Sequence, residues 1–327
     1  MSTGGLLSKD HRLALARQIT AVENGTPAGQ KALDETFSRA GRAFLVGVTG
    51  APGTGKSSLV NQLSKYLRTE KHLTVGIVAV DPSSPFTGGA ILGDRVRMRD
   101  LSGDDGVFIR SMASRGALGG LALTTAGVVQ LLDAAGYEVV LIETVGAGQS
   151  EIEIARLAHT TLVVEAPGLG DDIQSIKAGI MEIADILVLN KADLPGVEST
   201  ERALRSALEL GYLAGVSGKA GHKQAVDELQ PVNSGWQPPV IKTVATQGVG
   251  MQELADAIFK HWEYLQDSDI LKQRSRERLQ VEFAQLLRSM LYDDWQRDHP
   301  QSQIDEVMEQ VYTRRISPRQ AVEQLIK

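Results

Sequence analysis

Short apolar runs and amphipathic stretches alternate along the chain between residues 44 and 245. A short apolar run bounded by turn residues is typical of a buried strand, and apolar positions three or four residues apart indicate a helix. Together they predict an α/β fold with a mainly parallel sheet flanked by helices. The expected strands are residues 44–48, 74–80, 137–142, 160–166, 186–190 and 239–245, and the expected helices are 57–70, 119–135, 151–157 and 172–184.

Both ends of the chain carry helical patterns. The N-terminal pattern places Leu13, Ala16, Ile19 and Val22 on one face of a helix over 8–22, and residues 28–40 can form a second short helix. From about residue 263 no strand signal remains, and a third C-terminal helix starts at Ser317-Pro318. The two apolar stripes before it are Leu279, Phe283, Leu286, Leu287, Met290 and Leu291, and then Ile304, Val307, Val311 and Tyr312.

These patterns divide the chain into three parts. We expect an N-terminal helical extension over 1–40, a central α/β domain over 41–262 and a C-terminal helical arm over 263–327. The arm either pads the central domain or packs on a second subunit.

Composition narrows the class of protein. A hydrophobic fraction of 42% and a charged fraction of 23% are those of a soluble globular protein, and a net charge of −6 argues against a broad nucleic-acid surface. The absence of cysteine excludes disulfides, thiolate zinc sites and cysteine nucleophiles. The N-terminus lacks a signal-peptide core, and no apolar run approaches the roughly 20 residues of a membrane span. We therefore expect a cytoplasmic protein that does not enter a membrane.

The stretch GVTGAPGTGKSS predicts a phosphate-binding loop. It satisfies the pattern G-x-x-x-x-G-K-[ST] and lies between an expected strand and an expected helix, which is the context that the motif requires. Backbone N–H groups and the helix N-terminus would surround the phosphates, Lys56 would bridge the β- and γ-phosphates, and the Ser57 hydroxyl would bind Mg²⁺. The predicted loop residues are Gly50, Ala51, Pro52, Gly53, Thr54, Gly55, Lys56, Ser57 and Ser58.

Two carboxylates follow neighbouring expected strands. Asp81 ends the second strand, and Glu143 ends a later one, where Gly146 completes an acidic-x-x-Gly pattern. Because the carboxyl ends of parallel strands meet at one edge of the sheet, both carboxylates are candidates for the magnesium site beside the loop. Asp81 is also a candidate to position the attacking water.

The base is predicted by Asn190-Lys191-Ala192-Asp193, which follows the apolar run ILVL. The Asp193 carboxylate can accept hydrogen bonds from guanine N1–H and from the exocyclic amine, a pair of donors that adenine lacks. Each such bond to a charged group is worth about 1.5–3 kcal/mol, so the motif selects GTP over ATP. Asn190 would reach N7 of the base, and the stem of Lys191 would lie along it.

The chain resembles the MeaB/ArgK group of GTPases, whose human member is the methylmalonic aciduria type A protein. The resemblance extends from about Arg12 to about Thr246. It is carried by GVTGAPGTGKS, AVDPSSPFTGGAILGDRVRM, FIRSMASRGALGG, IETVGAGQSE, PGLGDDIQSIKAGIMEIAD and NKAD, in the order of the family.

The resemblance implies a P-loop GTPase of the class of the signal-recognition and nickel-insertion GTPases. It implies a homodimer joined through the C-terminal helices, and a chaperone that gates adenosylcobalamin loading of an acyl-CoA mutase of the methylmalonyl-CoA mutase type. It adds Asp94 to the magnesium candidates. Its guanine loop corresponds here to Thr243-Val244-Ala245-Thr246, where relatives often carry Ser-Ala, and a backbone N–H among Val244, Ala245 and Thr246 is expected to contact the base. It also implies nucleotide-sensitive segments that contact the mutase, with Gly146, Asp171, Gln174 and Lys177.

Hydrolysis is expected to be slow without a partner. Ala147 follows Gly146, where Ras-like GTPases carry the glutamine that orients water. Gln149 could move in to orient the water when a partner orders the segment, or it could simply begin a helix. Further arginines are either phosphate or partner contacts or solvated charges, namely Arg95, Arg97, Arg110 and Arg115.

Parts of the sequence are shared with three other classes of protein. A nickel-insertion GTPase needs soft or imidazole ligands, and the chain has no cysteine and only six histidines without a His-rich cluster. A small-molecule kinase would use ATP, which the guanine motif disfavours. A nucleotide-dependent scaffold with negligible catalysis shares every binding residue, so the sequence leaves it open.

Overall fold

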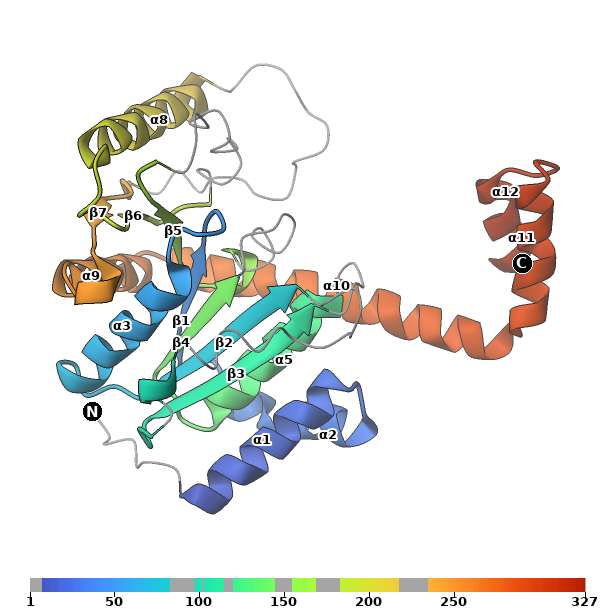
Figure 1. Ribbon diagram of the computed structural model, residues 1–327. Coiled ribbons are helices and arrows are strands. Elements are labelled where there is room, and N and C mark those ends of the chain that lie inside the picture. The colour runs from blue at the N-terminus through green and yellow to red at the C-terminus, as the bar shows by residue number, and fades with distance from the viewer. Residues whose placement is uncertain are drawn as a thin grey trace. The chain divides into compact units, whose positions relative to one another are not determined.

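A seven-stranded parallel sheet forms the centre of the protein (Figure 1). Its strand order is β3-β2-β4-β1-β5-β6-β7, and every neighbouring pair is parallel. The strands are β1 (Phe44–Thr49), β2 (Val75–Pro82), β3 (Val107–Ser114), β4 (Val139–Thr144), β5 (Thr160–Glu165), β6 (Ile186–Leu189) and β7 (Val240–Lys242). The computed structural model describes residues 8–82, 98–101, 103–114, 120–144, 155–168, 183–217 and 235–326.

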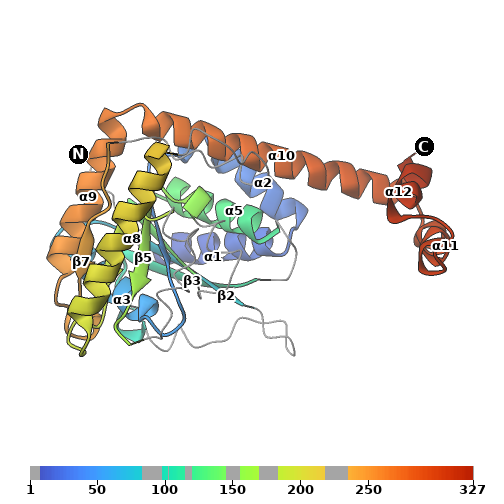
Figure 2. The ribbon, with the colours of Figure 1, turned by 90° about the horizontal axis from the view of Figure 1, so that it is seen from above.

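Helices cover both faces of this sheet (Figures 1 and 2). The helices on one face are α3 (Lys56–Thr69) and α9 (Met251–Asp267), and those on the other are α1 (Lys9–Glu23), α2 (Pro27–Thr36) and α5 (Gly120–Ala134). Helix α8 (Val197–Ser217) packs against β6 and β7. Short 3₁₀ turns are η1 (Phe37–Arg39), η2 (Arg99–Leu101) and η4 (Ala245–Gln247). The predicted α/β fold is therefore confirmed.

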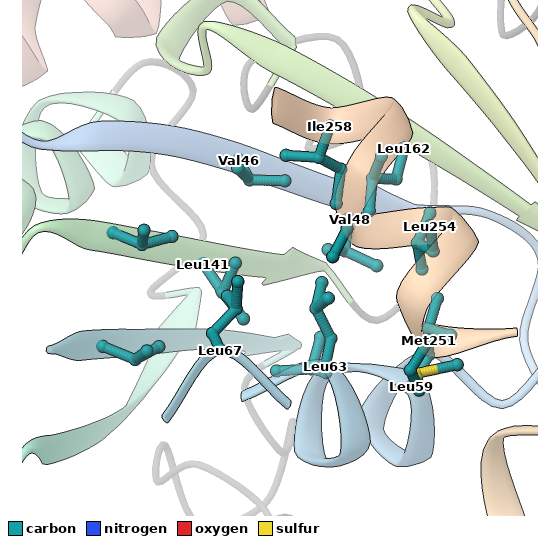
Figure 3. Close-up of a cluster of buried hydrophobic side chains, with 14 of the residues drawn as sticks. Val46, Val48, Leu59, Leu63, Leu67, Leu141, Leu162, Met251, Leu254 and Ile258 are labelled. Carbon is teal, nitrogen blue, oxygen red and sulfur yellow. The ribbon is translucent and has the colours of Figure 1, made fainter. Parts of the chain in front are cut away.

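Alternating side chains of β1 divide the core into two layers. Val46 and Val48 face α3 and α9, where they pack with residues such as Leu63 and Leu254 (Figure 3). Leu45 faces the opposite way, toward α1 and α5. A strand buried on both faces explains why its sequence is an uninterrupted apolar run.

The first helix buries the expected face, with one difference at its start. Ala16, Ile19 and Val22 pack against the core as expected, whereas Leu13 is 53% exposed and Leu15 is buried in its place. The apolar positions of this helix allow two overlapping faces. Packing against α5 decided between them.

Two elements had no counterpart in the sequence prediction. Strand β3 was missed because Arg110 and Ser111 interrupt its apolar pattern, which an edge strand tolerates. Helix α8 was also missed, although buried Leu204 and partly buried Leu208 mark one of its faces. In addition, β7 ends at Lys242, and Val244 instead forms an antiparallel bridge with Val249.

The chain forms two compact units, Met1–Ser275 and Arg276–Lys327. Helix α10 (Ile270–Asp298) contributes to both, and α11 (Gln301–Tyr312) and α12 (Pro318–Ile326) complete the second. Val307, Ala321 and Leu325 form the small core of the second unit. The domain limits expected after residues 40 and 262 remain predictions. None of the described helices is long and apolar enough to cross a membrane.

Candidate functional site

The glycine-rich segment after β1 turns tightly around backbone atoms of its neighbours. Gly50 has φ of 138°, and a Cβ there would lie 2.1 Å from the carbonyl oxygen of Val164 on β5. Gly55 caps α3 with φ of 93°, and its Cβ would lie 2.5 Å from the Asn190 amide nitrogen. Both positions therefore require glycine. The N–H groups of the first turn of α3 are directed toward this segment, as an anion site needs.

The buried ammonium group of Lys56 lies inside this loop. Its Nζ donates to the carbonyl oxygens of Gly50, at 2.8 Å, and Ala51, at 3.0 Å. Thr54 Oγ1 donates to the same Ala51 carbonyl at 2.9 Å, which closes the loop. The positive charge is thus positioned before any phosphate binds, and a charged phosphate oxygen is a stronger acceptor than these carbonyls.

Ser57 and Glu143 come together at the carboxyl edge of the sheet. Ser57 Oγ donates to Glu143 Oε1 at 2.6 Å, and both side chains are buried. Glu143 is in this position because β4 pairs with β1 in the register Val48↔Glu143, one residue before β1 ends. Hydroxyl and carboxylate oxygens are ligands that Mg²⁺ prefers, so this pair fits a magnesium ion bound to phosphate.

Asn190 connects the glycine-rich loop to the last strands of the sheet. Its Nδ2 donates to the Thr54 carbonyl at 2.8 Å. Its Oδ1 accepts from the Ala245 backbone N–H at 3.0 Å and from Thr243 Oγ1 at 3.1 Å. Asn190 and Thr243 are almost completely buried. The amide therefore holds together three segments that are far apart in the sequence.

The turn after Asn190 presents the carboxylate of Asp193 to solvent. Lys191 adopts φ of 57°, a conformation that non-glycine residues seldom take. Two hydrogen bonds stabilise it, from Ala192 N to Thr243 O and from Leu194 N to Lys191 O, both at 3.0 Å. The side chain of Asp193 is exposed at this turn. A base seated beside Asn190 could therefore meet the carboxylate.

The expected guanine loop lies next to Asn190. Val244 and Ala245 are buried and Thr246 is exposed, in and just before η4. Thr243 begins the stretch that corresponds to the guanine loop but was not among the residues predicted to contact the base. In the structure its side chain contacts Asn190, a role that a buried threonine at the end of a strand does not reveal in the sequence.

Several predicted site residues lie outside the described parts of the chain. These are Asp94, Gly146, Gln149, Asp171, Gln174 and Lys177, together with Arg95, Arg97 and Arg115. The backbone of Asp81 belongs to the end of β2, as expected, but its side chain is not among those described. Arg110 is described, and it forms an ion pair with Glu23 of α1. Its position supports a structural interpretation of that arginine.

Known proteins are similar to this chain over most of its length. The sequence profile of a family described as methylmalonyl Co-A mutase-associated GTPase MeaB matches residues 15–299. A relative from Pyrococcus abyssi is 43% identical over 321 residues, which cover 98% of this chain and 94% of the relative. The GTPase ArgK of Escherichia coli is 38% identical over 281 residues, which cover 85% of this chain and 80% of ArgK.

A more distant relative and a solved structure extend the comparison. The mitochondrial methylmalonic aciduria type A homolog of Caenorhabditis elegans is 31% identical over 287 residues, which cover 84% of this chain and 68% of that protein. The crystal structure of an LAO/AO transport system kinase has a TM-score of 0.63 at 29% identity and covers 96% of this chain and 92% of its own. The sheet and its flanking helices are therefore shared with a solved structure.

Proposed function

The chain belongs to the MeaB family of GTPases, and we propose that it binds GTP with Mg²⁺ and hydrolyses GTP to GDP and phosphate. The observation that carries this proposal is the position of Asn190. One buried amide contacts the phosphate loop at Thr54 and the guanine loop at Ala245. Asn190 therefore fixes the distance between the phosphate loop and the guanine loop. A nucleotide whose phosphates occupy the first loop would place its base in the second, beside Asp193.

Each group of the site has a role in this proposal. Lys56 would transfer its hydrogen bonds from the loop carbonyls to the β- and γ-phosphates. The oxygens of Ser57 and Glu143 would hold Mg²⁺, which neutralises phosphate charge when it is bound. Asp81 and Asp94 complete the proposed magnesium set. The carboxylate of Asp193 would read guanine, with Val244, Ala245 and Thr246 along the base.

Two residues are candidates to position the attacking water. We assign the positioning of the attacking water to Asp81 or to Gln149, because the acidic-x-x-Gly segment is followed by alanine. A group that is brought into place only by a partner makes intrinsic hydrolysis slow.

Single-turnover GTP hydrolysis tests the enzymatic proposal. Lys56→Ala should reduce the rate by about 10²-fold or more, because it removes a cation that stabilises charge in the transition state. Lys65→Ala is the matched control, since Lys65 lies on the same helix and pairs with Asp100 at the surface. Tight GTP binding without measurable turnover in the unmodified chain would instead favour a nucleotide-dependent scaffold.

Base selection has its own test. Asp193→Asn should weaken GTP and favour xanthosine triphosphate, whose C2 oxygen can accept from the new amide. Calorimetric affinities for GTP, xanthosine triphosphate and ATP would measure the change. If the variant keeps its preference for GTP, Asp193 does not read the base.

The partner that we propose is an adenosylcobalamin-dependent acyl-CoA mutase of the methylmalonyl-CoA mutase type. The description of the family and the name of the nematode relative support this assignment. GTP binding and hydrolysis would change which conformation of the partner-contacting segments is populated, and so gate cofactor docking and protect the mutase. These segments carry the predicted contact residues Gly146, Asp171, Gln174 and Lys177.

Hydrolysis rates with and without purified mutase test this coupling. We expect acceleration by the mutase, and equal rates would contradict it. Co-purification of the tagged chain with and without a non-hydrolysable GTP analogue would identify which mutase it binds.

A homodimer formed through α10 completes the proposal. Leu279, Phe283, Leu286 and Met290 recur every three or four residues on one face of that helix, and all are exposed. Light scattering should therefore show a dimer that Met290→Glu dissociates. Arg288→Glu is the control on the opposite face of the helix, and an unmodified chain that is monomeric at high concentration would overturn the proposal.

A further inference from the structure

A buried cluster of charged side chains lies at the amino edge of the sheet, opposite the nucleotide site. Asp185, the residue before β6, occupies its centre. Its Oδ2 accepts from the Thr161 backbone N–H at 2.8 Å, and its Oδ1 accepts from Arg274 Nη2 at 3.1 Å. His261 Nε2 of α9 lies 3.3 Å from the same Oδ1. One carboxylate oxygen therefore faces an arginine and a histidine together.

Both histidine nitrogens are used when the ring is neutral. His261 is 1% exposed, and its Nδ1 lies 2.7 Å from Thr160 Oγ1. With the proton on Nε2, that N–H faces Asp185 Oδ1 at 3.3 Å and Nδ1 accepts from the threonine hydroxyl, so each ring nitrogen faces a polar atom that suits it. A second proton on Nδ1 would require the hydroxyl to reverse and would place a second cation beside Arg274.

Other groups around the ring do not offset that charge. The Trp236 ring is tilted by 52° against the His261 ring, with centroids 4.7 Å apart, and its Nε1 donates to the Asp185 carbonyl. Tyr264 of the same helix stacks on His261 at 6.2 Å. His159 accepts from the Leu45 backbone N–H through Nδ1. Among the described residues, Asp185 is thus the one carboxylate that faces this ring.

Arg274 is the member of the cluster that can reach water. Its side chain is 32% exposed, compared with 11% for Asp185 and 1% for His261. It lies in the second turn of α10 and also donates to the His159 carbonyl at 2.9 Å. The next residue, Ser275, is the last of the first compact unit. The cluster therefore fastens α10 just before the chain enters its second unit.

We propose that Asp185, His261 and Arg274 form a pH-sensitive latch, which holds the first turns of α10 while His261 is neutral and releases Arg274 when His261 is protonated. When two cations compete for one carboxylate, the cation that can be hydrated leaves at the lower cost. Burial lowers the pKa of His261 below its ordinary value. The charge of Arg274 lowers this pKa further, and the charge of Asp185 raises it in part. The latch is accordingly closed at neutral pH and opens in mild acid.

The competition between the two cations has a reciprocal consequence. If protonation of His261 expels Arg274, then removal of Arg274 must make protonation easier. NMR titration of the His261 ring in the full chain should show a higher pKa in Arg274→Gln, by about one unit, which is a tenfold change in the protonation equilibrium. Lys272→Gln removes a surface cation of the same helix, which pairs with Asp269, and should leave the pKa unchanged.

Amide hydrogen exchange then measures the release of the helix. Between pH 7.5 and pH 5.5, protection of residues 273–275, the first amides of α10 with a main-chain acceptor, should fall by about tenfold in the unmodified chain, while the amides of β5 and β6 keep their protection. His261→Gln, which cannot take up the proton, should abolish the pH dependence, and Arg274→Gln should show low protection at both pH values. An unchanged His261 pKa in Arg274→Gln would overturn the proposal. So would loss of protection in β5 and β6 in parallel with residues 273–275.

Discussion

The two edges of the sheet differ in the charged side chains that contact their main-chain atoms. At the carboxyl edge, side-chain donors contact main-chain carbonyls, as Lys56 does at Gly50 and Asn190 does at Thr54. At the amino edge, carboxylates accept main-chain N–H groups where strands begin. Asp133, Glu138, Asp104 and Asp185 accept from the backbone at Ala43, Thr74, Gly106 and Thr161, respectively.

This difference follows from the direction of parallel strands. Strands that begin at one edge leave unpaired N–H groups there, and carboxylates satisfy them with charge-assisted hydrogen bonds. The opposite edge can then keep its N–H groups and its cation for an anionic ligand. We infer that the amino edge supplies stability and the carboxyl edge supplies binding, and substitutions at the two edges should have separable effects.

The largest expected effect is at the carboxyl edge, in Gly50→Ala. The new methyl group would overlap the Val164 carbonyl, so we expect loss of nucleotide binding and destabilisation by about 3 kcal/mol or more. Gly41→Ala is the matched control, because Gly41 also has positive φ, 92°, but has no atom within 4 Å of the added carbon. It should cost about 1 kcal/mol of backbone strain. Urea unfolding and GTP titration measure both variants, and normal binding by Gly50→Ala would contradict the loop geometry.

The next largest effect is expected at the amino edge, where a substitution should lower stability without weakening nucleotide binding. Asp185→Ala leaves Arg274 and the Thr161 N–H without their acceptor, and should destabilise the protein by about 3 kcal/mol while GTP affinity stays near that of the unmodified chain. Asp269→Ala removes a carboxylate that is 92% exposed, and should change stability by less than about 0.5 kcal/mol. A large fall in GTP affinity with unchanged stability would reverse the assignment of the two edges.

A smaller effect is expected from Thr243→Val, which removes one hydrogen bond to Asn190. Loss of about 1 kcal/mol corresponds to roughly fivefold weaker GTP binding, and Thr243→Ser should restore it. The threonine acts through Asn190, so the substitution should have no further effect on affinity in an Asn190→Ala background. Thr69→Val, at an exposed helix position, serves as the control. Additive losses in the double variant would show that Thr243 acts independently.

The smallest effect concerns acid stability at the amino edge. Hydrogen bonds from Arg68 hold the pKa of Asp104 below its ordinary value of 3.8. A depressed carboxylate pKa contributes stability above the unfolded value and loses it as pH falls through the folded one. Asp104→Asn should therefore flatten the acid limb of the stability curve below about pH 4. The expected change is under about 1 kcal/mol because the pair is partly exposed, and denaturant midpoints between pH 2 and pH 7 would measure it.

The residues of the carboxyl edge could be predicted from the sequence, whereas those of the amino edge could not. Gly50, Lys56, Ser57 and Asn190 lie in short contiguous motifs, so their segments could be located from sequence alone. Their positions in the described structure agree with that expectation, whereas their ligand contacts remain proposals. The clusters around Asp185 and Asp104 unite residues that are distant along the chain, and no local pattern marks them.

Sequence patterns that extend over a few residues therefore determined the strands and the location of the candidate site. The apolar runs required buried parallel strands, and the loop and guanine motifs located the candidate site at their carboxyl ends. Only tertiary packing decided that α1 buries Leu15 and leaves Leu13 exposed, that Thr243 supports Asn190, and that Arg274 reaches Asp185. The physical reason is that periodicity and turn chemistry act over a few residues, whereas burial of a charge depends on which distant partners reach it.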